Sequence, residues 1–158
     1  MRNKLKIAML AAILPGLACA TLGNNPATIN NDLQVLNGNL ATSNVQTKNA
    51  NPTTLIHNAK YDVYIFTTAQ GITVKQYVAN DQVFAISWRG PRIPNLRQLY
   101  GTYFNSYSQT KTQNTGMSQR VINTLDLDAS TYGINGAFVG RAVLKTQLPE
   151  GVTIENLK

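Results

Sequence analysis

The chain has 158 residues, of which 43% are hydrophobic and 13% charged, a composition typical of a globular protein rather than a wholly disordered one. It contains one histidine, His57, and one cysteine, Cys19, which excludes zinc sites built from Cys and His, CxxC redox chemistry and haem attachment. The length predicts one domain that can bury a core without disulfides or a metal. We therefore predict no cofactor and no metal site.

The first twenty residues have the three regions of a secretory signal peptide, in the required order. Three basic residues stand near the start, residues 7–17 are mostly apolar, and Ala18-Cys19-Ala20 supplies the small residues that precede a cleavage site. The apolar stretch is about half the roughly 20 residues of a spanning helix, and no later segment is apolar enough to cross a bilayer. We expect cleavage after Ala20, a periplasmic or secreted protein that begins at Thr21, and no transmembrane segment in the mature chain.

Cys19 allows an alternative, because bacterial lipoproteins are cut before a cysteine that is then lipidated. Gly16 occupies the position where a lipoprotein signal normally has a leucine-like residue, which favours ordinary cleavage. A lipid anchor at Cys19 is therefore the alternative to a freely diffusing protein. Ordinary cleavage would leave a mature chain without cysteine, and hence without disulfides.

The net charge of +7 comes from 14 basic and 7 acidic residues, and three of the basic residues lie in the leader. The mature chain would then carry about +4, with no run of lysine or arginine. Nucleic-acid binding requires a concentrated basic surface, so nucleic acid is not predicted as a partner.

Residues 21–58 are rich in asparagine and threonine and show no sustained period of 2 or 3.6 residues. We interpret them as a solvated arm or linker, although short apolar pieces such as residues 33–36 could dock on the domain. The arm precedes a single domain at residues 59–158.

The domain begins with three segments that are typical of antiparallel strands, at residues 61–68, 72–78 and 83–89. Turns at Gln70-Gly71 and Asn80-Asp81 separate them, which predicts a meander. Strict alternation in the third strand divides its side chains between a bulky and a small face: Phe84, Ile86 and Trp88 against Val83, Ala85 and Ser87. A helix is expected to approach the small face.

An amphipathic helix is predicted at residues 94–107, because its leucines and aromatic residues recur at helical spacing. A polar loop at residues 106–119 and two strands at residues 120–127 and 134–144 follow. The glycines at 133, 136 and 140 suggest a bulge or close backbone contact. The predicted fold class is α+β, with a mainly antiparallel sheet of about five strands and one amphipathic helix packed on it.

Few residues are suited to catalysis, and we predict no catalytic residue. His57 lies in the polar arm, and no Gly-x-Ser-x-Gly elbow precedes a helix, so a solvated histidine is favoured over a catalytic one. Asp126 and Asp128 would share one side of a strand and could bind a cation, but the neighbouring Thr and Ser favour an ordinary exposed edge.

The turn after the third strand combines an aromatic residue, prolines and arginines. Trp88, Arg89, Arg92 and Arg97 could converge there, and three guanidinium groups would suit a carboxylate or phosphate. In the competing interpretation Arg97 and Arg141 pair with Asp62 or Asp126 or donate to backbone carbonyls, and the other two arginines are solvated.

Several segments in order resemble one bacterial exported family, domain of unknown function 2844. The most specific is the block Phe84-Ala85-x-x-Trp88-x-Gly90-Pro91-x-x-Pro94-x-Leu96-Arg97; residues 20–23, 71–78 and 136–142 also match. The resemblance implies a small envelope protein with an arm before its domain, and it implies no activity. The family often has acids where this chain has Gln76 and Asn95, and an amide cannot serve as a general base.

Two classes of function remain open. The first is a non-enzymatic binding or interaction module of the cell envelope, with an anionic envelope component or an envelope protein as partner. The alternative is a hydrolase or transferase with an unrecognised carboxylate site.

Overall fold

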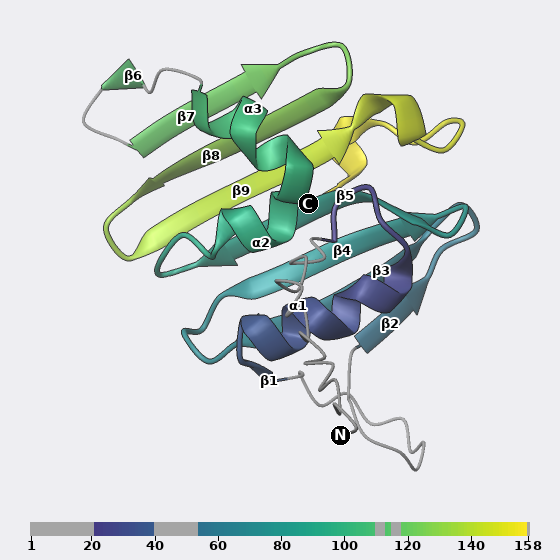
Figure 1. The fold of residues 1–158 in the computed structure, drawn as a ribbon, viewed down its shortest axis with the longest axis horizontal. Coiled ribbons are helices and arrows are strands. Elements are labelled where there is room, and N and C mark those ends of the chain that lie inside the picture. The colour runs from purple at the N-terminus through teal and green to yellow at the C-terminus, as the bar shows by residue number, and fades with distance from the viewer. Residues whose placement is uncertain (1–20, 40–53, 110–112, 115–117, 158) are drawn as a thin grey trace, which may run out of the picture.

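A computed structural model describes residues 21–39, 54–109, 113–114 and 118–157, so the predicted signal peptide lies outside the described residues. The described strands form one antiparallel sheet in the order β1-β3-β4-β5-β9-β8-β7-β6, and β2 also pairs with β3 (Figure 1). The strands are β1 (Gly38–Asn39), β2 (Thr54–His57), β3 (Asp62–Thr68), β4 (Thr73–Ala79), β5 (Gln82–Gly90), β6 (Gln113–Asn114), β7 (Ser118–Asn123), β8 (Leu127–Ile134) and β9 (Ala137–Leu144). The mainly antiparallel α+β fold is thus as predicted.

The predicted meander corresponds to β3, β4 and β5. Asn80 and Asp81 both have positive φ, at 51° and 57°, and form a two-residue turn between the paired residues Ala79 and Gln82. Asn and Asp tolerate this backbone conformation better than most residues, which explains why they mark the hairpin.

The second half of the sheet has more strands than the sequence predicted. The expected strand at residues 120–127 ends at Asn123, and a new strand, β8, begins at Leu127 after a turn. β8 was not predicted as a separate strand, because Asp128, Ser130 and Gly133 interrupt its apolar pattern. Seven described strands have four or more residues and two have only two, so the expectation of about five strands was too low.

The helices lie on one face of the sheet (Figure 1). They are α1 (Ile29–Val35), α2 (Leu96–Tyr100) and α3 (Phe104–Gln109), with 3-10 turns before α1 and between α2 and α3. The single helix predicted at residues 94–107 is broken at Gly101, whose φ of 54° and ψ of −123° interrupt the helical backbone. Asn95 caps α2 by accepting a hydrogen bond from the Gln98 backbone N–H at 3.3 Å.

The prediction of a solvated arm is wrong for the described parts of residues 21–58. Leu22 is buried in the core, and so are Ile29 and Leu33, because α1 presents an apolar stripe toward the sheet. Two backbone hydrogen bonds fix the segment before α1: Gly23 N–H donates to the Val83 carbonyl at 2.8 Å, and Val83 N–H donates to the Asn24 carbonyl at 2.9 Å. β1 and β2 then pair with the outer edge of β3, whereas residues 40–53 of the predicted arm lie outside the described residues.

A β-bulge changes the predicted division of β5 into two faces. Tyr77 pairs with Ala85 while the next residue, Val78, pairs with Val83, so Phe84 is an extra residue. Val83 therefore joins Ile86 and Trp88 in the core under the helices, whereas Phe84 and Ala85 join the cluster under the C-terminal segment. The helices cover the bulky face and not, as expected, the small one.

Trp88 and Gly140 lie directly opposite each other on β5 and β9. A Cβ atom at position 140 would lie 2.4 Å from the Trp88 ring, which confirms the close contact expected of this glycine. The indole N–H of Trp88 donates to the Tyr100 hydroxyl at 3.3 Å, so β5, β9 and α2 meet at this ring.

Candidate functional site

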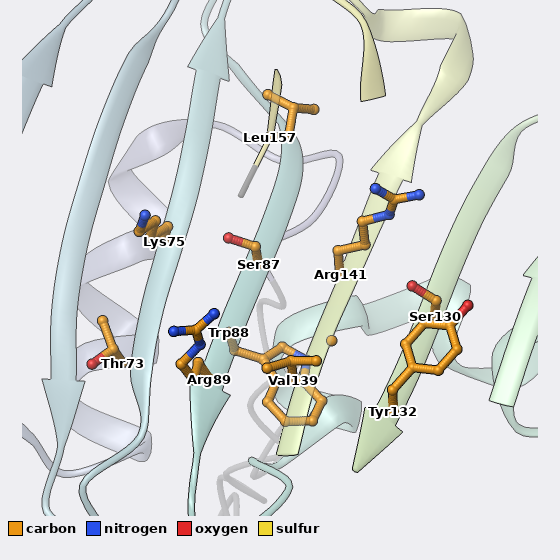
Figure 2. A pocket seen from close by; sticks show the side chains of 11 residues that line it. Thr73, Lys75, Ser87, Trp88, Arg89, Ser130, Tyr132, Val139, Arg141 and Leu157 are labelled. Atoms are coloured by element: carbon orange, nitrogen blue, oxygen red, sulfur yellow. The ribbon is translucent and has the colours of Figure 1, made fainter. Parts of the chain in front are cut away.

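The sheet face opposite the helices carries a hollow of about 660 Å³ (Figure 2). β4, β5, β8 and β9 form its floor, and Leu157 of the C-terminal segment lies at one end. The residues that line it are Thr73, Lys75, Ser87, Trp88, Arg89, Ser130, Tyr132, Val139, Gly140, Arg141 and Leu157.

Strand register arranges most of this lining in two parallel rows. The first row runs across four strands as Lys75, Ser87, Arg141 and Ser130. The second row, two residues away from the first on each strand, consists of Thr73, Arg89, Val139 and Tyr132. The hollow exists because the short side chains of Ser87 and Ser130 alternate with long ones in the first row.

Three cationic residues surround Ser87 in this lattice. Lys75 and Arg141 occupy the two neighbouring strands, so their backbones are about 10 Å apart at the usual strand spacing. Arg89 follows two residues along β5, about 7 Å from Ser87. The described lining contains these three basic residues and no Asp or Glu, so its charged side chains are all cationic.

Arg141 is held by two contacts outside the hollow. Its Nη2 lies 3.6 Å from Asp128 Oδ1, and its Nη1 donates to the carbonyl of Ile154 at 3.5 Å. Its buried Nε has no acceptor among the described residues. Asp128 thus offsets one positive charge at the rim.

The structure brings together only part of the predicted binding cluster. Trp88 borders the hollow but its side chain is 3% exposed and lies in the core, since neighbours on a strand point to opposite faces. Arg97 lies on α2, with its guanidinium over the Phe104 ring at 5.1 Å from the centroid. Arg92 is exposed and does not line the hollow. Only Arg89 of the three arginines faces it.

Sequence reasoning missed Lys75 as a site residue and considered Arg141 only as a partner for acids or backbone carbonyls. Both alternate with buried neighbours on their strands, and this period of two is the signal that could have placed them on the same face as Arg89. Their proximity depends on β5 pairing with β9 across fifty residues of chain, which no local pattern reveals.

A second polar cluster is enclosed between the sheet and the helices. Asp32 of α1 is fully buried and accepts hydrogen bonds from the Thr21 hydroxyl and from the amides of Gln76 and Gln98, the latter two at 2.7 Å. Burial raises the pKa of Asp32 to about 6, against the lowering effect of the three donors. The predicted arm thus contributes a buried carboxyl that the sequence analysis overlooked.

The remaining acidic and histidine candidates are dispersed. His57 is 73% exposed and its Nδ1 lies 2.7 Å from Asp62 Oδ1. Asp126 lies in the turn before β8 whereas Asp128 pairs with Arg141, so the expectation that both share one side of a strand is wrong. Within the part of the chain that the structure describes, no three His, Cys, Asp or Glu side chains gather in a way that could hold a metal.

Comparisons with known proteins give one match. A family model described as "Protein of unknown function (DUF2844)" matches residues 18–157. Neither the curated proteins nor the solved structures gave a match. Among the described residues, no helix has the length and apolar character that crossing a membrane requires.

Proposed function

The chain belongs to the DUF2844 family, proteins of unknown function, and we propose that it is an exported, non-enzymatic module that binds an anionic component of the cell envelope. The hollow on the open sheet face is the proposed binding site. The observation that carries the proposal is the placement of Lys75, Arg89 and Arg141 around Ser87 with no carboxylate in the described lining.

This arrangement suits a carboxylate or phosphate group. Guanidinium groups bind such groups with two parallel hydrogen bonds, and the hydroxyls of Ser87 and Ser130 add donors between the cations. Tyr132 and Val139 are 39% and 38% exposed and offer apolar contact to the rest of the ligand, as in a sugar ring. An acidic glycan of the envelope combines both properties.

The described residues favour binding over catalysis at this place. A hydrolase or transferase would need a general base near the bound ligand, and the described lining has neither a carboxylate nor an imidazole. Asp32 has a raised pKa, but it is enclosed between the sheet and the helices, on the face away from the hollow.

Export supports an envelope partner. The basic, apolar and small-residue regions of residues 1–20 are those of a secretory signal, and Thr21 would begin the mature protein. Lipidation at Cys19 would instead attach the module to a membrane. Intact mass of the exported protein distinguishes the two, because a lipidated chain retains Cys19 and carries acyl groups.

The proposal is tested with a matched pair of arginines. Arg89 lines the hollow and Arg92, three residues later, is exposed outside it. We expect Arg89→Gln to weaken retention on purified peptidoglycan sacculi and lipopolysaccharide vesicles about five- to tenfold at low salt, because one charged contact is lost.

Arg92→Gln changes the net charge equally and should leave retention nearly unchanged. Equal weakening by both variants would mean that binding follows net charge alone, and no weakening by either would remove the hollow from consideration. Release of soluble fragments from the sacculi would favour the hydrolase alternative.

A further inference from the structure

Asp32 has no cationic partner among the described residues. Its carboxyl faces Thr21 before α1, Gln76 on β4 and Gln98 on α2, none of which titrates near neutral pH. The ion pairs His57–Asp62 and Arg141–Asp128 do not involve Asp32. Burying a carboxylate without a counter-charge costs free energy, so a cation beside Asp32 would stabilise its ionised form.

The backbone nitrogen of Thr21 belongs to the residue whose hydroxyl donates to that carboxyl. The Thr21 hydroxyl donates to Asp32 Oδ2, and three covalent bonds separate this hydroxyl oxygen from the nitrogen of the same residue. Standard bond lengths keep the two atoms within about 4 Å. Hydrogen bonds hold the residue in place, from Asn24 N–H to the Thr21 carbonyl at 3.0 Å and from Leu22 N–H to Leu99 at 3.2 Å.

Gln76 supplies a second, unfilled acceptor. Its side-chain Nε2 donates to Asp32 Oδ2 at 2.7 Å, which directs its Oε1 away from the carboxyl. Oε1 is buried and has no hydrogen-bond donor among the described residues. A buried acceptor without a partner is uncommon, because it loses its hydrogen bond to water without replacement.

We propose that Thr21, Asp32, Gln76 and Gln98 form a binding site for the α-ammonium group that leader removal creates on Thr21. The inference rests on the export part of the proposed function and does not depend on the hollow. Hydrolysis of the Ala20–Thr21 peptide bond by a leader peptidase consumes one water, leaves a carboxylate on Ala20 and converts the single N–H of Thr21 into an ammonium with three N–H donors. One donor would reach Asp32 and another Gln76 Oε1.

This site fits a structural role and not a catalytic one. An N-terminal threonine can act as a nucleophile, with its own amine as the base. Thr21 is completely buried, as is Asp32, so no substrate reaches its hydroxyl in the folded protein. The ammonium would stabilise the mature fold, and the uncleaved chain would lack that stabilisation.

The pH dependence follows from the charges. When Thr21 is in a peptide bond, burial raises the pKa of Asp32 to about 6, from 3.8. The folded state then binds the Asp32 proton more tightly than the unfolded state does. The stability that this proton contributes is therefore fully present below about pH 4 and is lost as the pH rises through about 6. An adjacent ammonium lowers the pKa of Asp32, and the mature protein should keep its stability through neutral pH.

The test compares two exported proteins. One begins at Thr21, as confirmed by intact mass; the other carries a serine inserted after Ala20, so that export leaves one residue before Thr21 and moves the amine by about 3.8 Å. We expect the extended protein to melt about 5 °C or more lower at pH 8. The difference should shrink at pH 4, because Asp32 of the extended protein is then protonated and no longer buries an unpaired charge. The same pair in an Asp32→Asn background should differ by less than about 1 °C.

Equal melting temperatures of the two proteins at pH 8 would overturn the proposal, as would a difference that survives unchanged in Asp32→Asn. If Asp32→Asn does not fold, the pH profiles of the first pair decide the question alone. An exported chain that begins elsewhere than Thr21 would refute the inference at its first step, while retention by Arg89→Gln would still report on the hollow.

Discussion

Gly140→Ala tests the packing of β5, β9 and α2 around Trp88. Gly140 does not have a positive φ, so alanine is compatible with its backbone. At such a position a glycine-to-alanine change that causes no steric clash stabilises a protein by about 0.4–1 kcal/mol. Here the new Cβ would lie 2.4 Å from Trp88 Cζ2 and 2.5 Å from Cε2, well inside van der Waals contact. The Trp88 side chain is 3% exposed and bonded to Tyr100, so it has little freedom to move.

We expect Gly140→Ala to destabilise the protein by about 1–3 kcal/mol, the usual cost of overpacking, which is about 4–12 °C in Tm for a domain of this size. Urea unfolding followed by far-UV circular dichroism measures the change. Trp88→Leu removes the ring, so Gly140→Ala added to it should cost less than about 0.5 kcal/mol. A stabilising Gly140→Ala, or an equal cost in both backgrounds, would refute the close contact.

Two further predictions concern α1, which the sequence analysis placed in a solvated arm, and the Asn80-Asp81 turn, which it predicted. Leu33→Ala should lower the free energy of unfolding in urea by about 2–5 kcal/mol, because Leu33 is 6% exposed and lies in the core. Val35→Ala on the same helix should lower it by less than about 0.5 kcal/mol, because Val35 is 49% exposed. Equally small effects of both variants would support the solvated arm instead. Asp81 has a φ of 57°, which glycine adopts freely and valine does not. Asp81→Gly should therefore leave Tm unchanged or raise it, and Asp81→Val should lower the free energy of unfolding by about 1–2 kcal/mol. Equal melting temperatures of the two variants would contradict this turn.

Local patterns were sufficient for the central hairpins and insufficient for their surroundings. Strand alternation and Asn80-Asp81 located β3, β4 and β5, because both signals arise within a few residues. The bulge at Phe84 reversed the face of Val83, and a bulge leaves no periodic trace in the sequence.

The helix α1 had a signal that was outweighed by composition. Asn25 caps the 3-10 turn that leads into α1 by accepting from the Ala27 N–H, and Pro26 begins that turn. Ile29, Leu33 and Leu36 then recur at helical spacing. The many asparagines around them favoured an arm, and tertiary burial against the sheet decided otherwise.

The candidate site was only partly accessible to sequence reasoning. Arg89 was selected because it leaves a strand among aromatic residues and prolines, and it does face the hollow. Trp88 was grouped with it although adjacent strand residues point to opposite faces, and the position of Arg97 depends on how α2 crosses the sheet. Lys75 and Arg141 come together through strand pairing between distant segments.

The most direct test of the proposed binding site is nuclear magnetic resonance of the isotope-labelled exported protein titrated with soluble peptidoglycan fragments that carry carboxylates. The account predicts that amide shifts change mainly in β4, β5, β8 and β9 around Lys75, Ser87 and Arg89, and that the changes diminish as salt is raised. Shifts confined to α1 and α2 on the opposite face, or no shifts at concentrations where the protein is retained on sacculi, would contradict it.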